Sequence, residues 1–149
     1  MEFVQGLSSL ENKKLESHAP QWYIFDDLMH EASVNDAVSN LFVRGSHHNN
    51  ISIILILQNF FGKGRESRTI SLNAHYIVFF KNPRDKLGLS HFSRQMYPGK
   101  TKKFLTVFDE ATLKPYSYLF IDLKPDTDEK IRLTKNVLGE EDFATAYVI

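Results

Sequence analysis

The sequence predicts an α/β fold in which helices flank a mostly parallel sheet. Two observations predict this class: short apolar stretches recur along the chain, and stretches of helical periodicity or polar character separate them. The apolar stretches lie at 21–25, 51–57, 75–80 and 116–123. Strands that are apolar on both faces are typical of parallel sheets, because helices cover both faces of such sheets. The length of 149 residues predicts a single domain spanning residues 1–149.

The first third of the chain is expected to alternate helix and strand. Leucines at 7, 10 and 15 predict a short helix at Leu7–Ser17. The run Gln21–Phe25 predicts a buried strand, and Asp26 and Asp27 follow it directly. Apolar residues at a spacing near 3.6 predict a helix that begins at Asp27 and ends near Gly45. Ile51–Leu57, with isoleucine at 51, 53, 54 and 56, predicts the second buried strand.

The rest of the chain continues the alternation. We expect a polar and partly helical connection at 66–73 and a third strand at 75–80. Two helices at 86–96 and 103–112, a fourth strand at 116–123 and a weaker extended segment at 130–137 should follow. Pro98 and Gly99 separate the two helices.

Composition excludes several classes of function. The chain has no Cys, which excludes a disulfide framework, a thiolate metal site and a Cys nucleophile. The N-terminus lacks the pattern of a signal peptide, and the longest apolar run, Ile53–Leu57, is too short to span a bilayer. We therefore expect an intracellular or virion-associated protein without a membrane anchor.

The net charge of zero conceals a segregation of charge along the chain. Residues 1–43 carry two basic and seven acidic groups, residues 44–103 eleven and two, and residues 104–149 five and nine. A basic middle block predicts a surface for phosphates or nucleic acid. Mutual neutralisation of the three blocks in the fold is an equally good explanation.

Polar groups follow three of the expected strands, and in parallel sheets ligands bind at these carboxyl ends. They are Asp26 with Asp27, Gln58 with Asn59, and Asn82 with Arg84. An apolar strand followed by two carboxylates is the Walker B arrangement, which holds one carboxylate beside a nucleotide-bound Mg²⁺ and lets the second polarise water. The alternative is that the two aspartates cap the following helix.

Gln58 stands where a sensor amide would contact the γ-phosphate or the attacking water, although an ordinary turn residue is the better explanation when this position is judged alone. The phosphate-binding P-loop itself is absent. Only Arg94–Thr101 approaches its pattern, but Arg94 replaces the first glycine, Pro98 removes one N–H, and a helical stretch precedes it where a strand is required. No histidine spacing suits a metal site, and no hydrolase elbow occurs.

The combined strings YIFDDLMHEA, LFVRGSHHNNISIILILQNFF, SRTISLNAHYIVFFKNPRD, SRQMYPG and PYSYLFIDLKP resemble the C-terminal half of viral genome-packaging ATPases. The similarity is to the FtsK/HerA-type enzymes of Maverick/Polinton elements and adintovirus-like viruses, and it runs from about Leu7 to Val137. It implies a P-loop NTPase-like (RecA/FtsK/HerA-type) core and an ATP-driven motor that assembles as a ring and packs double-stranded DNA into a viral capsid.

The resemblance also implies roles for single residues. Asp26 would be the Mg²⁺ carboxylate, Asp27 the catalytic carboxylate where many relatives have Glu, and Gln58 the sensor. Arg84 is the candidate for an arginine finger that acts on a neighbouring subunit's ATP, with Arg68 and Arg94 as competitors.

One departure from the family is large: only 20 residues precede Gln21, so the P-loop strand and helix are not in the sequence. Three explanations stay open: a truncated chain, one piece of a longer protein, or a shortened descendant with another role. The second hypothesis for function is therefore a non-enzymatic interaction or assembly module derived from such an ATPase.

Overall fold

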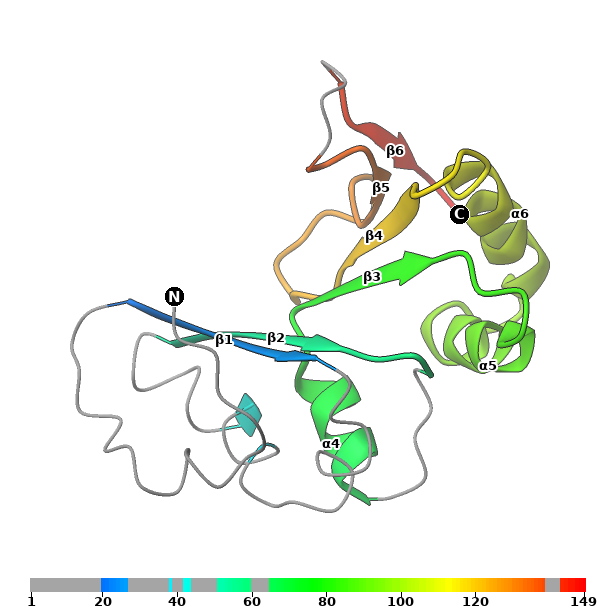
Figure 1. Cartoon of the computed structure of the whole chain (residues 1–149). Coiled ribbons are helices and arrows are strands. Elements are labelled where there is room, and N and C mark those ends of the chain that lie inside the picture. The colour runs from blue at the N-terminus through cyan, green and yellow to red at the C-terminus, as the bar shows by residue number, and fades with distance from the viewer. Residues whose placement is uncertain (1–19, 27–37, 39–41, 44–50, 60–64, 139–142) are drawn as a thin grey trace. The chain divides into compact units, whose positions relative to one another are not determined.

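The computed structural model is mixed α/β, as expected from the sequence (Figure 1). It describes residues 20–26, 38, 42–43, 51–59, 65–138 and 143–149. The chain divides into two compact units, residues 1–74 and 75–149, and each is described by itself below. The expectation that residues 1–149 form one domain stays a prediction. No helix in the described ranges combines the length and the apolar character that crossing a membrane requires.

The first unit contains a parallel pair of strands, β1 (Gln21–Asp26) and β2 (Ile51–Ile56), and the helix α4 (Arg65–Asn73). Their register runs from Gln21 opposite Ile51 to Asp26 opposite Ile56. One face of this pair packs on a core of Phe25, Val38 and Ile70, with Tyr23, Phe42, Ile53 and Leu55 around it. The parallel direction of these two strands therefore agrees with the sequence-based expectation.

The other face of the β1–β2 pair is exposed, so the expected burial of both faces is wrong for these strands. Trp22, Ile24, Ile54 and Ile56 are 68%, 50%, 39% and 48% exposed. Within the described residues, neither outer edge of the pair has a further strand hydrogen-bonded to it.

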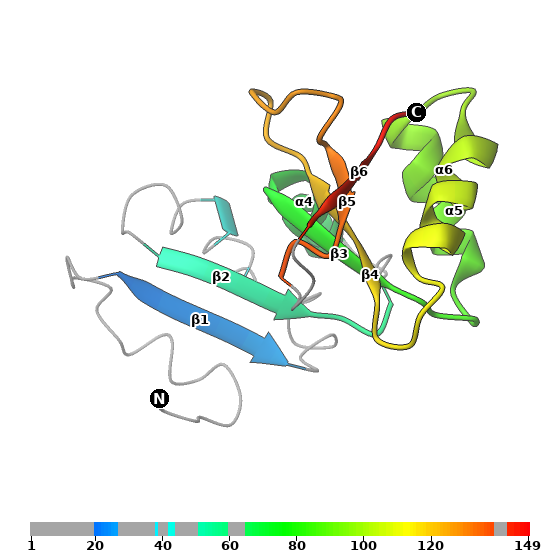
Figure 2. The same ribbon diagram turned by 90° about the horizontal axis from the view of Figure 1, so that it is seen from above.

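The second unit is an antiparallel sheet with two helices (Figure 2). Its elements are β3 (Tyr76–Phe80), α5 (Lys86–Met96), α6 (Thr101–Ala111), β4 (Tyr118–Asp122), β5 (Leu133–Lys135) and β6 (Thr145–Tyr147). The strand order is β3-β4-β5-β6, and all three pairings are antiparallel. The expected mostly parallel sheet is thus not confirmed.

The connection from β3 to β4 explains this direction. A single crossover helix returns the chain to the start of the preceding strand, and the next strand then runs parallel. Here two helices, α5 and α6, follow one another before β4 begins. The second helix brings the chain back to the end at which β3 finished, so β4 runs in the opposite direction.

The core of the second unit lies between the sheet and its helices. Its buried members include Phe92 and Phe104 from the helices and Leu119, Ile121 and Leu133 from the sheet. The Phe92 and Phe104 ring centroids are 6.0 Å apart. Two local features define where the helices begin. The Asp85 carboxylate caps the N-terminus of α5 by accepting a hydrogen bond from the Gly88 N–H at 3.0 Å. Gly99, with φ of 77°, lies in the turn before α6.

The remaining sequence-based elements have mixed outcomes. The helix at 86–96 is confirmed with the same bounds, and the other described elements differ from expectation by a few residues at their ends. The strand β6 was not expected. The helix at Leu7–Ser17 lies outside the described residues, as does most of the helix expected from Asp27.

Candidate functional site

The carboxyl ends of β1 and β2 bring two of the expected site residues to one edge of a sheet. Asp26 is the last residue of β1 and lies opposite Ile56, the last residue of β2. Gln58 follows Ile56 by two residues, and both Asp26 and Gln58 are exposed. Neighbouring strands lie about 4.8 Å apart and each residue advances by about 3.3 Å. The Asp26 carboxylate at the end of β1 and the Gln58 amide just after β2 therefore stand at the same end of this pair of neighbouring strands.

Of the other two expected residues, one lies outside the described residues and the other belongs to the second unit. Asp27 lies outside the described residues, so its predicted catalytic role stays a prediction. Arg84 belongs to the second unit, in the turn between β3 and α5, where its backbone N–H donates to Asn82 Oδ1 at 3.0 Å and its side chain is exposed. The third polar strand end, Asn82 with Arg84, therefore follows a strand of a different sheet.

The donor set described at this edge, one carboxylate and one amide, suits a Mg²⁺ ion that a nucleotide carries. Within the described ranges, no group of three or more His, Asp or Glu side chains could hold a metal ion. Mg²⁺ is commonly held by one or two carboxylates together with substrate phosphates and waters. Asp26 can supply one such carboxylate, and Gln58 can supply an amide beside it.

The phosphates of ATP, in contrast, find no cradle in the one stretch of sequence that approaches a P-loop. α5 ends at Met96 and α6 begins at Thr101, so a helix stands where the motif requires a strand. The Lys100 ammonium donates to the backbone carbonyl of Ile149 at 3.2 Å. The segment Arg94–Thr101 thus comprises the end of α5, a turn at 97–100 and the first residue of α6.

The competing arginines are placed as surface groups. Arg68 is an exposed residue of α4. Arg94 lies in the last turn of α5, where its guanidinium donates to Ser90 Oγ at 3.4 Å and a cation is favourable next to the helix carbonyls. Arg44 lies outside the described residues. None of these positions singles out the residue that would act on a neighbouring subunit's ATP.

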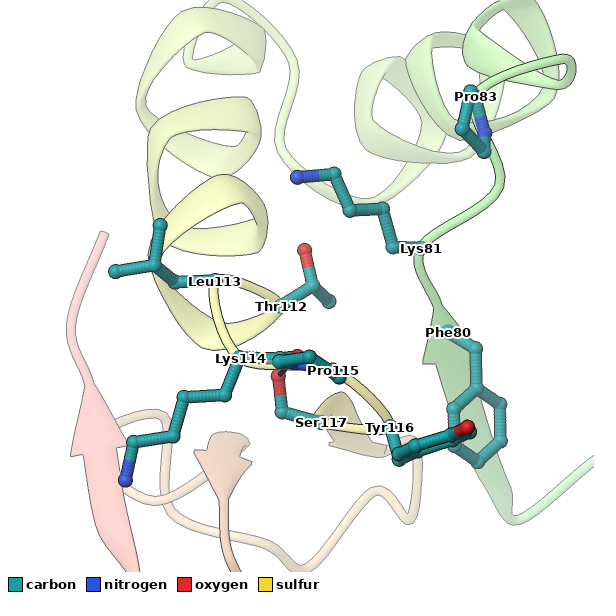
Figure 3. Close-up of a pocket in the computed structure, with 9 residues that line it drawn as sticks. All are labelled: Phe80, Lys81, Pro83, Thr112, Leu113, Lys114, Pro115, Tyr116 and Ser117. Atoms are coloured by element: carbon teal, nitrogen blue, oxygen red, sulfur yellow. Dashed lines mark hydrogen bonds between the residues drawn. The ribbon is translucent and has the colours of Figure 1, made fainter.

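A second candidate region lies in the second unit, where a hollow of about 420 Å³ opens between the end of β3 and the turn from α6 to β4 (Figure 3). We call it the Tyr116 hollow; its lining includes apolar Phe80, Leu113, Pro115 and Tyr116 and the cations Lys81 and Lys114. Tyr116 is 95% exposed and has φ of 62°. A bulky residue in the left-handed region is an unusual backbone state, which is more frequent at functional sites than elsewhere.

Shifted pKa values occur in the second unit and have structural causes. Burial, followed by the neighbouring Glu129 carboxylate, raises the pKa of the Tyr97 phenol, while Arg132 opposes this. A hydrogen bond with Tyr147 raises the pKa of Lys135. The Lys135 ammonium lies 3.7 Å from Glu110 Oε1, which also accepts from the Tyr147 hydroxyl at 3.3 Å. Lys135, Glu110 and Tyr147 thus link β5 and β6 to α6 and stabilise the fold of the second unit.

The Tyr116 hollow was not among the sites expected from the sequence. The sequence pattern places Tyr116 at the start of the expected strand 116–123, whereas β4 begins at Tyr118 and leaves Tyr116 in the preceding turn. Phe80, at the end of the third expected strand, was assigned to the core, but the structure leaves it 57% exposed.

The fold and these sites define a mixed α/β protein with a carboxylate and an amide at the end of a parallel strand pair. No protein-family model matches the chain, nor does any curated protein or solved structure. The resemblance to viral packaging ATPases therefore stays a prediction.

Proposed function

We propose that the first unit is the Walker B and sensor half of an ATP-driven DNA-packaging motor with a P-loop NTPase-like core. The observation that carries this proposal is the parallel register of β1 and β2, which ends with Asp26 opposite Ile56. Two consecutive strands, one ending in Asp26 and the next followed by Gln58, thereby end at one edge of the pair. Phosphoryl transfer needs this combination of a metal-binding carboxylate and a group that orients the nucleophile.

Each residue has a defined part in the proposal. Asp26 holds the nucleotide-bound Mg²⁺, which when present neutralises charge on the phosphates. Asp27 accepts a proton from the attacking water, and Gln58 orients that water. Arg84 serves a neighbouring subunit's ATP from its exposed turn, in an assembly of several copies. The basic block 44–103, with eleven basic and two acidic groups, faces the phosphates of double-stranded DNA.

The proposal requires a polypeptide segment that supplies the P-loop, since the sequence contains none. Among the described strands, none pairs with the outer edges of β1 and β2, so these edges offer hydrogen-bonding positions for another strand. The viral capsid is the proposed docking partner of the complete motor, and the proposed place of action is the host cell interior or the virion.

The binding of a fluorescent ATP analogue with Mg²⁺ tests this proposal. Binding by the 149-residue chain is compared with binding by an extended chain that also includes the upstream part of its reading frame. We expect weak or no binding by the chain alone and saturable binding by the extended chain. In the extended chain, Asp26→Asn should weaken binding in Mg²⁺ but not in EDTA, whereas Asp109→Asn, an exposed change on α6, should have no effect. An extended chain without a P-loop, or with Mg²⁺-dependent binding unaltered by Asp26→Asn, would refute the proposal.

One observation favours the second candidate, a non-enzymatic assembly module. The face of the β1–β2 pair that carries Trp22, Ile24, Ile54 and Ile56 is exposed, and contiguous apolar patches of this kind mark interaction surfaces. Sedimentation velocity of the wild-type chain and of Trp22→Ser tests it. Self-association that Trp22→Ser abolishes, together with absent ATP binding by the extended chain, would favour the module over the motor.

A further inference from the structure

The Tyr116 hollow has the size of a small-ligand site and combines aromatic and cationic groups. Its volume of about 420 Å³ lies within the range of ligand pockets. In Figure 3 the rings of Phe80 and Tyr116 lie on the same side of the hollow, and the Lys81 side chain reaches across it. All the residues that line the hollow belong to the second unit.

Its two aromatic rings are available for stacking. Tyr116 is 95% exposed and Phe80 is 57% exposed, so neither ring is consumed by the core. The Phe80 ring is supported from the sheet by Tyr118, whose centroid lies 5.8 Å away. Exposed aromatic rings beside cations are the usual stacking platforms for nucleic-acid bases.

The charges in the hollow favour an anion on one side only. Among the described residues that line it, two are lysines and none is acidic. Thr112 follows Ala111, the last residue of α6. The Thr112 hydroxyl already donates a hydrogen bond to the Phe108 carbonyl at 2.8 Å. Carbonyls at a helix C-terminus repel anions. A phosphate is therefore expected at the Lys81 ammonium and not at the C-terminal carbonyls of α6.

We infer that the Tyr116 hollow binds one nucleotide unit, with the base stacked on Tyr116 and Phe80 and the phosphate at Lys81. The unit comes either from a single-stranded nucleic acid or from a free nucleotide, since both present a planar base and a phosphate at the same spacing. This inference does not rest on the ATPase proposal, because it involves neither Mg²⁺ nor the Asp26 edge.

Fluorescence anisotropy in EDTA tests the inference with a labelled oligothymidylate of about twelve nucleotides, which is within the site sizes of single binding modules. Displacement by AMP distinguishes a free nucleotide from a strand. Tyr116→Asn removes the ring, and asparagine tolerates a positive φ, so the fold is retained. We expect Tyr116→Asn to weaken binding by about 5-fold to about 150-fold, the range for loss of one stacked base. Tyr116→Trp should retain binding.

The cationic part has its own matched control. Lys81→Gln should reduce the slope of log K against log salt by about 0.7, the value for one lost phosphate contact on a single strand. Lys102→Gln, an exposed change in the first turn of α6 and thus at the opposite end of this helix, should leave the slope unchanged.

Three results would overturn the inference. The first is oligonucleotide binding that Tyr116→Asn does not weaken, and the second is equal binding of an abasic strand, since both show that no base is stacked. The third is Tyr116-dependent binding of an acidic peptide without binding of oligonucleotide or AMP, which would make the hollow a peptide site.

Discussion

The guanidinium of Arg132 holds the turn between β4 and β5, and its removal is the sharpest test of the second unit. Nη1 donates to the carbonyls of Asp122 at 2.7 Å and Lys124 at 3.0 Å, Nη2 donates to the carbonyl of Thr127 at 2.7 Å, and Nε donates to Glu129 Oε1 at 2.7 Å. The Arg132 side chain is 11% exposed. One side chain thus satisfies three backbone acceptors of this turn.

The expected magnitude follows from these contacts. A hydrogen bond from a charged donor contributes at least about 1.5 kcal/mol, so three give about 4.5 kcal/mol at the low end. The ion pair with Glu129, whose side chain is 68% exposed, adds less than about 1 kcal/mol. Because water can reach part-buried carbonyls once the side chain is gone, we expect Arg132→Met to lower the free energy of unfolding by about 3 kcal/mol.

Urea unfolding followed by far-UV circular dichroism measures this loss. Arg132→Lys keeps the charge but lacks the planar fork, so it should recover less than half of the lost stability. Glu129→Gln removes only the exposed ion pair and should cost under about 1 kcal/mol. A loss below about 1 kcal/mol for Arg132→Met, or wild-type stability for Arg132→Lys, would refute the reasoning.

Three further predictions concern the same unit. Gly99→Ala should lower the stability measured by thermal unfolding by about 1 to 2 kcal/mol, because φ is 77°. Nothing lies within 4 Å of the added Cβ, so the loss comes from the backbone conformation alone; unchanged stability would contradict a left-handed turn. Tyr116→Gly should raise stability by up to about 1 kcal/mol by relieving the positive φ, and a loss would show that the ring stabilises the fold. The folded chain holds the Tyr97 phenol proton more tightly than the unfolded chain. The resulting contribution to the free energy of unfolding is therefore present below the unfolded pKa of about 10 and is lost as pH rises through the folded pKa. Tyr97→Phe should make the free energy of unfolding fall less steeply with rising pH, and an equally steep fall would exclude this cause.

Much of the fold could be predicted because its signals are local. The strands β1, β2, β3 and β4 are each dominated by apolar residues, and the helix at 86–96 has a cap at Asp85. β6 carries no such signal, since Thr145, Ala146 and Tyr147 are held by contacts with distant residues such as Lys135 and Glu110.

Strand direction and burial were less predictable. In β3, Ile77 points into the core whereas Tyr76, Val78 and Phe80 are 48%, 39% and 57% exposed. Apolar side chains on the exposed face hide the alternation that normally reveals an antiparallel strand. The sequence pattern therefore suggested burial on both faces and a parallel sheet.

The candidate site was predictable only in part. The proximity of Asp26 and Gln58 follows from parallel pairing, which consecutive apolar strands with a long connection favour. The expectation that Asn82 and Arg84 follow a strand of the same sheet relied on one continuous sheet, but β3 pairs in a separate one. The Tyr116 hollow depends on a turn conformation, which no periodic pattern encodes.

ATP turnover by the extended chain tests the central claim most directly. The account predicts Mg²⁺-dependent hydrolysis that Asp27→Asn lowers by about 10²-fold to 10⁴-fold, the usual effect of removing a general base, while binding of the ATP analogue persists and Asp109→Asn turns over normally. Equal turnover by Asp27→Asn and the unaltered extended chain would contradict it.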